Sequence, residues 1–334
     1  MKGYLIFVFK RLLQLAAVVF AGTSLAFFIA KLSPISAVEN IIARVTNQSS
    51  LSPTAIASLR ATYEELFGVN VPLLEQYFNF WGRLATGDFG PSLIAYPTPA
   101  MDLIMLALPW TTGLLMVSIV FTFILGNILG GLAGYYQNSR VLKGIGIVAI
   151  GIQPIPYYIV AFLMVIIFGY LWPVLPISGG FSMSIRPGWS VPYVLSVLHH
   201  AILPALSLVV TGLGLWFLGM RSLVSNIITE DYVTYAELGG VKKSRIVSSY
   251  VMRNAVVPQL TALAMALGQI FSGTIITEQV FSYPGLGTLL IRAVNGGDTT
   301  LVLAVSCISV IAVATAIFVI DLIHPFLDPR VRVS

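Results

Sequence analysis

The chain has 334 residues, of which 57% are hydrophobic and 9% are charged, and its mean hydropathy is +0.92. Because a soluble domain carries about 25% charged residues, this composition excludes an ordinary soluble globular protein and predicts a polytopic membrane protein. The single cysteine, Cys307, excludes an intrachain disulfide and is expected to act as a small packing residue.

Six apolar stretches are expected to cross the membrane as helices, which makes the fold class all-α. Each is long enough for a hydrocarbon core of ~30 Å at about 1.5 Å per residue. The first stretch follows Lys10 and Arg11, as in a signal peptide, but no convincing small-x-small cleavage site follows, so we interpret it as a retained helix. The expected spans are 12–30, 106–134, 145–172, 199–220, 255–280 and 301–323. The expected domains are 1–30 with the first span, 31–105 as an insertion, and 106–334 with the other five spans.

Residues 31–105 are expected to form a helical insertion outside the membrane. Ser52-Pro53 is typical of a helix start, and Gly68 is the expected end of that helix. Pro72 opens a second helix, and Gly87 begins the tract that ends it. The apolar side chains of this second helix that fall near one face are Leu73, Tyr77, Phe80 and Leu84. We expect this apolar face to be buried, either by a partner protein or by packing within the insertion as a cap that binds no partner.

The second and third spans carry small residues and prolines. Gly126, Gly130 and Gly134 are four residues apart, so they lie on one face where another helix can approach closely. Tight packing within the subunit explains this face better than a dimer seam does. In the third span, Gln153-Pro-Ile-Pro-Tyr-Tyr158 has two prolines that kink a helix and free backbone carbonyls. The kinked end either lines a pathway or packs against protein.

Lysine and arginine positions set the expected orientation. With both termini inside, twelve of the 18 basic residues lie on the cytoplasmic side, and four of the other six lie in the long 31–105 segment, where the positive-inside rule does not apply. The net charge of +5 therefore reflects topology and implies no nucleic acid. The cytoplasmic basic residues are Lys2, Lys10, Arg11, Arg140, Lys143, Arg221, Lys242, Lys243, Arg245, Arg253, Arg330 and Arg332.

The 229–258 segment is a charged helix-turn-helix between two strongly apolar stretches. Glu230 and Asp231 occupy the expected first helical turn, where carboxylates favour the positive end of the helix dipole. Gly239-Gly240 predicts the end of that helix. Lys242, Lys243 and Arg245 open a second helix that returns to apolar sequence. A membrane protein that places such a segment on its basic side is expected to present it to a soluble partner.

This segment resembles the "EAA" loop of permease subunits of binding-protein-dependent ABC importers, in the dipeptide/oligopeptide/nickel branch. The matching residues are Glu230-Asp231-Tyr232-Val233, Ala236, Gly240, Ile246, Arg253-Asn254-Ala255 and Pro258. The 18 residues from Gly240 to Pro258 are similar to the peptide-type interval, whereas Glu237-Leu238 replaces the more usual Arg-Ala. The resemblance implies short coupling helices that dock on a cytoplasmic ATPase. The implied coupling residues are Glu230, Asp231, Tyr232, Ala236, Glu237, Gly239, Gly240, Lys242, Arg245, Arg253, Asn254 and Pro258.

Further tracts extend this resemblance over nearly the whole chain. They are Gly87-Asp-Phe-Gly90 with Ser92-Leu93, Phe281-Ser-Tyr-Pro-Gly-Leu-Gly287 and Leu327-Asp-Pro-Arg-Val-Arg332. In the family, the insertion lies on the outer surface near the docked binding protein, which makes Tyr77, Trp81, Asp88 and Tyr283 candidate contacts. One tract departs from the peptide-type pattern: Ser33-Pro-Ile-Ser-Ala37 stands in place of Pro-Gly-Asp-Pro. Peptide therefore leads as the expected substrate, and oligosaccharide is a close alternative.

The resemblance implies a type I ABC importer permease fold in a bacterial or archaeal cytoplasmic membrane. The expected partners are a second related permease, two ATPase subunits and an external binding protein. The chain has no Gly-x4-Gly-Lys-Ser/Thr, so ATP and magnesium are expected on the ATPase subunits. It also has no His-Glu-x2-His, Gly-x-Ser-x-Gly or Cys-x2-Cys, so neither an enzyme nor a metal site is expected.

Ionisable residues lie near the ends of the expected spans, as Glu278, Asp321 and Arg221 do, and none lies clearly at the midplane. A proton-coupled carrier would need a buried carboxylate there, so a stand-alone channel or ion-coupled carrier is the weaker alternative. Uncharged polar residues are left as pathway candidates, with helix–helix hydrogen bonding as their alternative role. These candidates are Gln153, Tyr157, Ser207, Thr211, Gln269, Ser272 and Thr274.

Overall fold

The computed structural model describes residues 2–32, 42, 46, 52–66, 71–268 and 275–327. Within these ranges the regular structure is helical, apart from one isolated β-bridge between Pro91 and Pro99. This agrees with the all-α fold class, because an apolar chain in a membrane satisfies its backbone hydrogen bonds within each helix.

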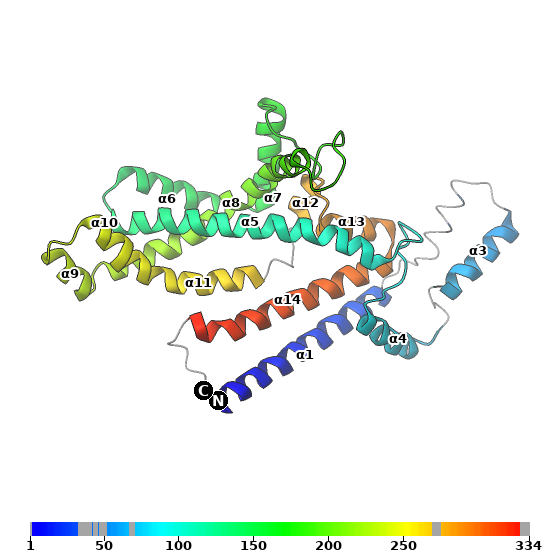
Figure 1. Ribbon diagram of the computed structural model, residues 1–334. Helices are drawn as coiled ribbons and strands as arrows, with labels where there is room; N and C mark the ends of the chain where they lie inside the picture. Colours follow the sequence, from blue (N-terminus) through cyan, green and yellow to red (C-terminus); the bar gives the residue numbers. More distant parts are fainter. Residues whose placement is uncertain are drawn as a thin grey trace.

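Four long helices form the body of the molecule and run nearly lengthwise through it (Figure 1). They are α1 (Lys2–Leu32), α5 (Ala100–Tyr135), α8 (Val191–Ile227) and α14 (Thr299–Leu327). Each is long and apolar enough to cross a membrane. They contain the first, second, fourth and sixth expected spans, and every one begins earlier and ends later than its apolar stretch. Hydropathy locates the part of a helix in lipid, while the helix itself continues beyond it.

The third expected span, 145–172, is not one helix. The chain forms α6 (Arg140–Ile152), α7 (Tyr157–Val165) and the π-helix η1 (Ile166–Leu171), with a bend of 105° between α6 and α7. The break lies at Gln153–Pro156, where Pro154 and Pro156 have no N–H to continue the helix. The two prolines were expected to kink this span, and the structure shows a right-angled turn, which we call the elbow (residues 153–156).

The fifth expected span, 255–280, corresponds to α11 (Arg253–Gly268) and α12 (Ile275–Val280). Residues 269–274 lie between them and outside the described residues, so Gln269, Ser272 and Thr274 have no structural account. Among the described residues, four helices qualify as membrane spans, or five if the bent α6–α7 pair is one span. The expected count of six is not reached there.

Shorter helices lie at the two ends of the body. They are α3 (Pro53–Leu66), α4 (Leu73–Thr86), α9 (Asp231–Leu238), α10 (Lys243–Arg245), the π-helix η2 (Ile246–Met252) and α13 (Leu286–Gly296). In Figure 1, α9 and α10 lie at the left end of the molecule and α4 and α13 toward the right, so we refer to the α9 end and the α13 end.

The predicted helix boundaries of the insertion are largely confirmed. The Ser52 hydroxyl accepts a hydrogen bond from the Ala55 amide at 3.3 Å, as a residue capping the start of α3 does. Gly87 ends α4 with a φ of 71°, in the left-handed region that suits glycine. Gly68 lies outside the described residues.

The glycine face of α5 packs against α8. A Cβ on Gly126 would lie 2.5 Å from the Cβ of Trp216, and one on Gly134 would lie 2.8 Å from the carbonyl oxygen of Arg221. A Cβ on Gly130 would collide with the backbone of Phe217. The two helices can approach this closely only because the side chains are absent, which confirms packing within the subunit.

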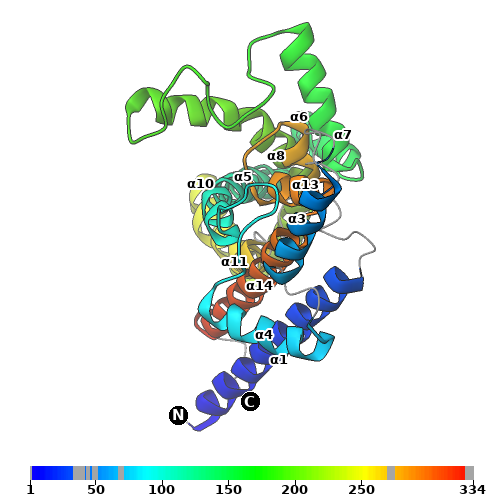
Figure 2. The same cartoon turned by 90° about the vertical axis from the view of Figure 1, so that its right-hand side faces the viewer.

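Helices α1 and α14 pack together along their length, and the start of α1 lies beside the end of α14 (Figure 1). Near the start of α1 and the end of α14, an Arg11 guanidinium nitrogen lies 3.1 Å from a carboxylate oxygen of Asp321. At the other end, the Phe27 ring lies 5.1 Å from that of Phe80 on α4, measured between centroids. In contrast, Figure 2 shows that α7 and the chain leading into α8 project away from this body.

Candidate functional site

The α9 end of the molecule consists of α9, α10 and η2, which follow the long helix α8. Glu230 and Asp231 begin α9 as predicted, and Gly239 follows its last residue. Gly240 then adopts a φ of 71°, which a residue with a side chain would adopt only with strain. The second predicted helix begins at Lys243 as α10 and continues after three residues as the π-helix η2. The sequence therefore placed this turn correctly, but it contained no sign of the π-helical geometry.

One face of α9 is anchored to the transmembrane helices. Val233 is 1% exposed and Ala236 is 8% exposed. These two side chains belong to one buried apolar cluster with residues of α8, η2 and α11, namely Met220, Val224, Ile246, Val251 and Ala255. Burying a valine side chain fully contributes about 1.5–3 kcal/mol. Val233 and Ala236 therefore attach α9 to α8, η2 and α11.

The opposite face of α9 exposes large apolar side chains. Tyr235 is 72% exposed and Leu238 is 80% exposed, and their spacing of three residues places them on the same side of the helix. The flanking charged side chains are also exposed. An apolar patch with a charged border is typical of a contact site for another protein. Tyr235 and Leu238 were not among the residues expected at this site, although each lies two residues after a buried position, Val233 or Ala236, and so on the opposite side of the helix.

Two sets of hydrogen bonds hold α9 against its neighbours. The side-chain amide of Asn254 donates to the Tyr232 hydroxyl at 3.1 Å and to the Tyr250 carbonyl at 2.8 Å. The Tyr135 hydroxyl, at the end of α5, donates to the Glu237 carboxylate at 3.4 Å. Tyr232 and Asn254 were both expected at this site, and the fold brings them together although they are 22 residues apart.

The other residues expected in the 229–258 segment are on the surface. Glu230, Asp231, Lys242, Arg245 and Arg253 are exposed. Gly239 and Gly240 form the exposed turn, and Pro258 lies inside α11 without ending it. The segment thus combines an anchored inner face with an exposed outer face that carries both signs of charge.

The pathway candidates separate into two groups. Gln153 and Tyr157 are exposed at the elbow. Ser207 is fully buried and donates to the Pro204 carbonyl at 2.8 Å, while Thr211 donates to the Ser207 carbonyl at 2.9 Å. Both of these hydroxyls hydrogen-bond within their own helix, whereas Gln153 and Tyr157 are on the surface of the chain.

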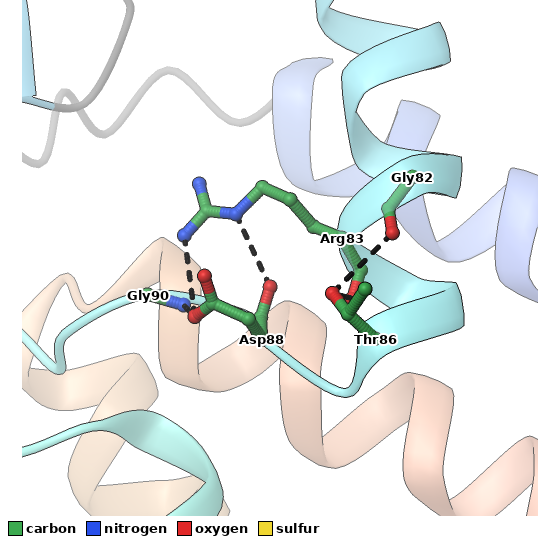
Figure 3. Close-up of polar contacts among 5 residues, drawn as sticks. All are labelled: Gly82, Arg83, Thr86, Asp88 and Gly90. Carbon is green, nitrogen blue, oxygen red and sulfur yellow. Dashed lines mark hydrogen bonds and ion pairs between the residues drawn. The ribbon is translucent and has the colours of Figure 1, made fainter.

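At the α13 end, the candidate binding-protein contacts differ in exposure. Tyr77 and Trp81 on α4 are packed against α1, with a hydrogen bond of 2.7 Å between the Tyr77 and Ser24 hydroxyls. Asp88 is exposed, and its carboxylate lies 3.8 Å from an Arg83 guanidinium nitrogen (Figure 3). Tyr283 is only 3% exposed, its ring packs against Trp110, and burial raises the pKa of its phenol to about 12. Asp88 is therefore accessible to a partner in this structure, and Tyr283 is not.

Two buried carboxylates organise this end. Glu278 accepts hydrogen bonds from the Thr111 hydroxyl at 2.7 Å and from the Gly287 amide at 2.8 Å, so it caps the start of α13. From the sequence, Glu278 was expected only to lie near the end of a span.

Asp298 was not among the residues for which the sequence indicated a role. One of its oxygens accepts from the Ser92 hydroxyl at 2.6 Å and from the Leu93 and Ile94 amides, and the other accepts from the Leu301 amide at 2.9 Å. It therefore caps α14 and fixes the loop before α5. The Asp-Thr-Thr-Leu tract at 298–301 carried the local capping signal, but nothing in it indicated the distant loop.

Comparison with known proteins places this geometry in context. Residues 126–333 match the family described as "Binding-protein-dependent transport system inner membrane component". The chain is 29% identical over 331 residues to the oligopeptide transport system permease protein OppB of Haemophilus influenzae, covering 98% of this chain and 99% of that protein. It is 26% identical to the oligopeptide permease AppB of Bacillus subtilis, covering 84% and 88% of the two chains. It is also 26% identical to the di/tripeptide permease DppB of Pseudomonas aeruginosa, covering 98% of each.

Proposed function

Because the chain belongs to the family of binding-protein-dependent transport system inner membrane components, we propose that it forms half of the translocation pathway of an ATP-driven importer. Its similarity to oligopeptide and dipeptide permeases supports the peptide branch of ABC permeases. The proposed substrates are di- and oligopeptides. The oligosaccharide alternative depended on the Ser33–Ala37 tract, which lies outside the described residues, while the relatives described above are named for peptides.

The exposed apolar face of α9 is the observation that carries the proposal. Tyr235 and Leu238 form a surface on which a soluble ATPase subunit binds, while Val233 and Ala236 attach the same helix to α8 and α11. ATP-driven movement of the ATPase therefore moves α9 together with these transmembrane helices. The coupling requires that the ATPase binds the α9 surface differently in its two states, since equal binding would shift no equilibrium.

The elbow at residues 153–156 supports a pathway between this subunit and a second permease. It interrupts a segment that is apolar enough to span the membrane, and its two prolines leave backbone carbonyls without their usual helical donors. Irregular backbone at membrane depth is tolerated only where it faces protein or a water-filled cavity. Gln153 and Tyr157 are exposed at this point, so we assign them to the wall of the pathway.

The proposed assembly contains this chain, a related permease, two ATPase subunits and an external binding protein. The α9 end and both termini are assigned to the cytoplasm, and the α13 end is assigned to the outside. ATP and magnesium are assigned to the ATPase subunits. Of the candidate contacts for the binding protein, the geometry favours Asp88, which is exposed beside Arg83 (Figure 3).

The test compares two substitutions of the same kind at similar exposure. Leu238→Asp places a charge on the proposed ATPase surface, and Leu74→Asp places one on α4, where the leucine is 70% exposed. We expect Leu238→Asp to reduce retention of the ATPase subunits during affinity purification of the complex, together with peptide uptake into vesicles. Leu74→Asp is expected to retain the ATPase subunits. Equal retention in both variants would contradict the proposed surface.

A further inference from the structure

A cavity of about 880 Å³ lies beside α9, between two walls that come from distant parts of the chain. One wall is the connection from α5 to α6, residues 136–139, and the other contains Glu237, Val241 and Lys243. The walls are joined at Tyr135, whose hydroxyl donates to Glu237 at 3.4 Å. A molecule in this cavity would therefore contact both α9 and the start of α6.

The lining of the cavity suits a protein segment. Leu142 and Ile228 provide apolar surface, and Tyr136 adds an aromatic ring. The lining also contains amide, hydroxyl and charged groups of both signs, which an acyl chain would leave without hydrogen-bond partners. Small-molecule sites occupy about 300–1,000 Å³, and at 880 Å³ this cavity accepts several side chains of a loop or helix end. The expected occupant has an apolar tip and polar flanks.

We propose that the ATPase subunit that binds α9 also inserts a segment into this cavity, so that residues 136–139 form its second contact. This inference rests on the proposed function. It is favoured by continuity, because Glu237, Val241 and Lys243 belong both to the cavity and to the 229–258 segment. A protein bound to the outer face of α9 lies at the margin of the same cavity.

The second contact would reach a different helix from the first. Ser139 caps α6, since its hydroxyl accepts from the Leu142 amide at 3.4 Å. Helix α6 then runs along α8 and ends at the elbow. A Cβ on Gly146 would lie 2.9 Å from the Phe217 ring, so α6 and α8 are in close contact. Movement of residues 136–139 is therefore transmitted along α6 toward Gln153 and the pathway wall.

Site-specific labelling tests the second contact separately from the first. The chain has a single cysteine, Cys307, which is fully buried, so Cys307→Ala gives a cysteine-free background. Into it we would introduce Gln137→Cys in the cavity wall, Leu238→Cys on α9, or Lys10→Cys on α1 as an exposed control. Labelling with a hydrophilic maleimide is followed in the complete complex and in the permease pair without ATPase subunits.

We expect the ATPase subunits to slow labelling at least tenfold in both the Gln137→Cys and the Leu238→Cys variants, and to leave labelling of Lys10→Cys unchanged. Protection of Leu238→Cys alone would overturn the second contact and leave the proposed function intact. Protection of neither variant would overturn both the second contact and the proposed binding of the ATPase subunit to α9. A benzophenone maleimide on Gln137→Cys supplies the direct measurement, because an adduct identified by mass as the ATPase subunit supports the contact, and adducts confined to permease chains contradict it.

Discussion

Removal of the Asp298 carboxylate should destabilise the α13 end more than removal of any exposed charge. Asp298→Ala deletes the acceptor for the Ser92 hydroxyl and for the Leu93, Ile94 and Leu301 amides. Asp298 and Ser92 are both fully buried, so water cannot replace the lost acceptor without opening the structure. The loop before α5 and the start of α14 would lose their common attachment.

The size of the effect follows from these contacts. Loss of a helix cap costs about 0.5–2 kcal/mol, and each buried donor left without a partner costs about 1–3 kcal/mol. Partial opening of the loop to water limits the sum of these costs, so we expect a loss of about 3–5 kcal/mol in the free energy of unfolding. At about 2 °C per kcal/mol for a chain of this size, the unfolding midpoint should fall by roughly 6–10 °C.

The buried thiol of Cys307 offers the assay. It is the single cysteine of the chain and is fully buried, so a thiol-reactive fluorophore reports its exposure as the detergent-solubilised protein is heated. The control is Asp88→Ala, which removes a carboxylate that is 67% exposed and lies 3.8 Å from Arg83. Exposed ion pairs contribute about 0–1 kcal/mol, so the control should shift the midpoint by less than about 2 °C. Equal shifts for the two variants would refute the reasoning.

Two further predictions concern helix packing. Gly130→Ala should abolish accumulation of folded protein in the membrane, because the added Cβ would collide with the Phe217 backbone. The control is Gly113→Ala on the same helix, whose Cβ meets no atom within 4 Å, so this variant should accumulate normally. Similar levels of both variants, measured by fluorescence-detected size exclusion, would contradict the close packing of α5 against α8. Arg11→Asp should loosen α1 from α14 by placing two carboxylates together, and the exchange Arg11→Asp with Asp321→Arg should restore the thermal midpoint through the reversed pair. No recovery in the double variant would show that the 3.1 Å contact does not stabilise the helix pair.

The sequence by itself determined the membrane class, the four long spanning helices and the turn at Gly239-Gly240. These features depend on local properties that a single stretch carries. A helix in lipid must be apolar over its whole buried length, and a glycine after an amphipathic run favours the left-handed conformation that ends a helix. For the same reason, the starts of α3 and α4 were expected close to where they occur. The charged 229–258 segment was recognisable because charge is rare elsewhere in the chain.

Only the tertiary structure decided how these segments meet. Ser92 and Asp298 are 206 residues apart in sequence, and Thr111 and Glu278 are 167 apart, so no local pattern indicates that they share hydrogen bonds. The bend of 105° at the elbow is likewise not given by the local sequence, because two prolines interrupt a helix without fixing the direction in which the chain continues. The outer and inner faces of α9 became distinct only when α8, η2 and α11 covered Val233 and Ala236. Burial depends on which helices are neighbours, and those neighbours come from distant parts of the chain.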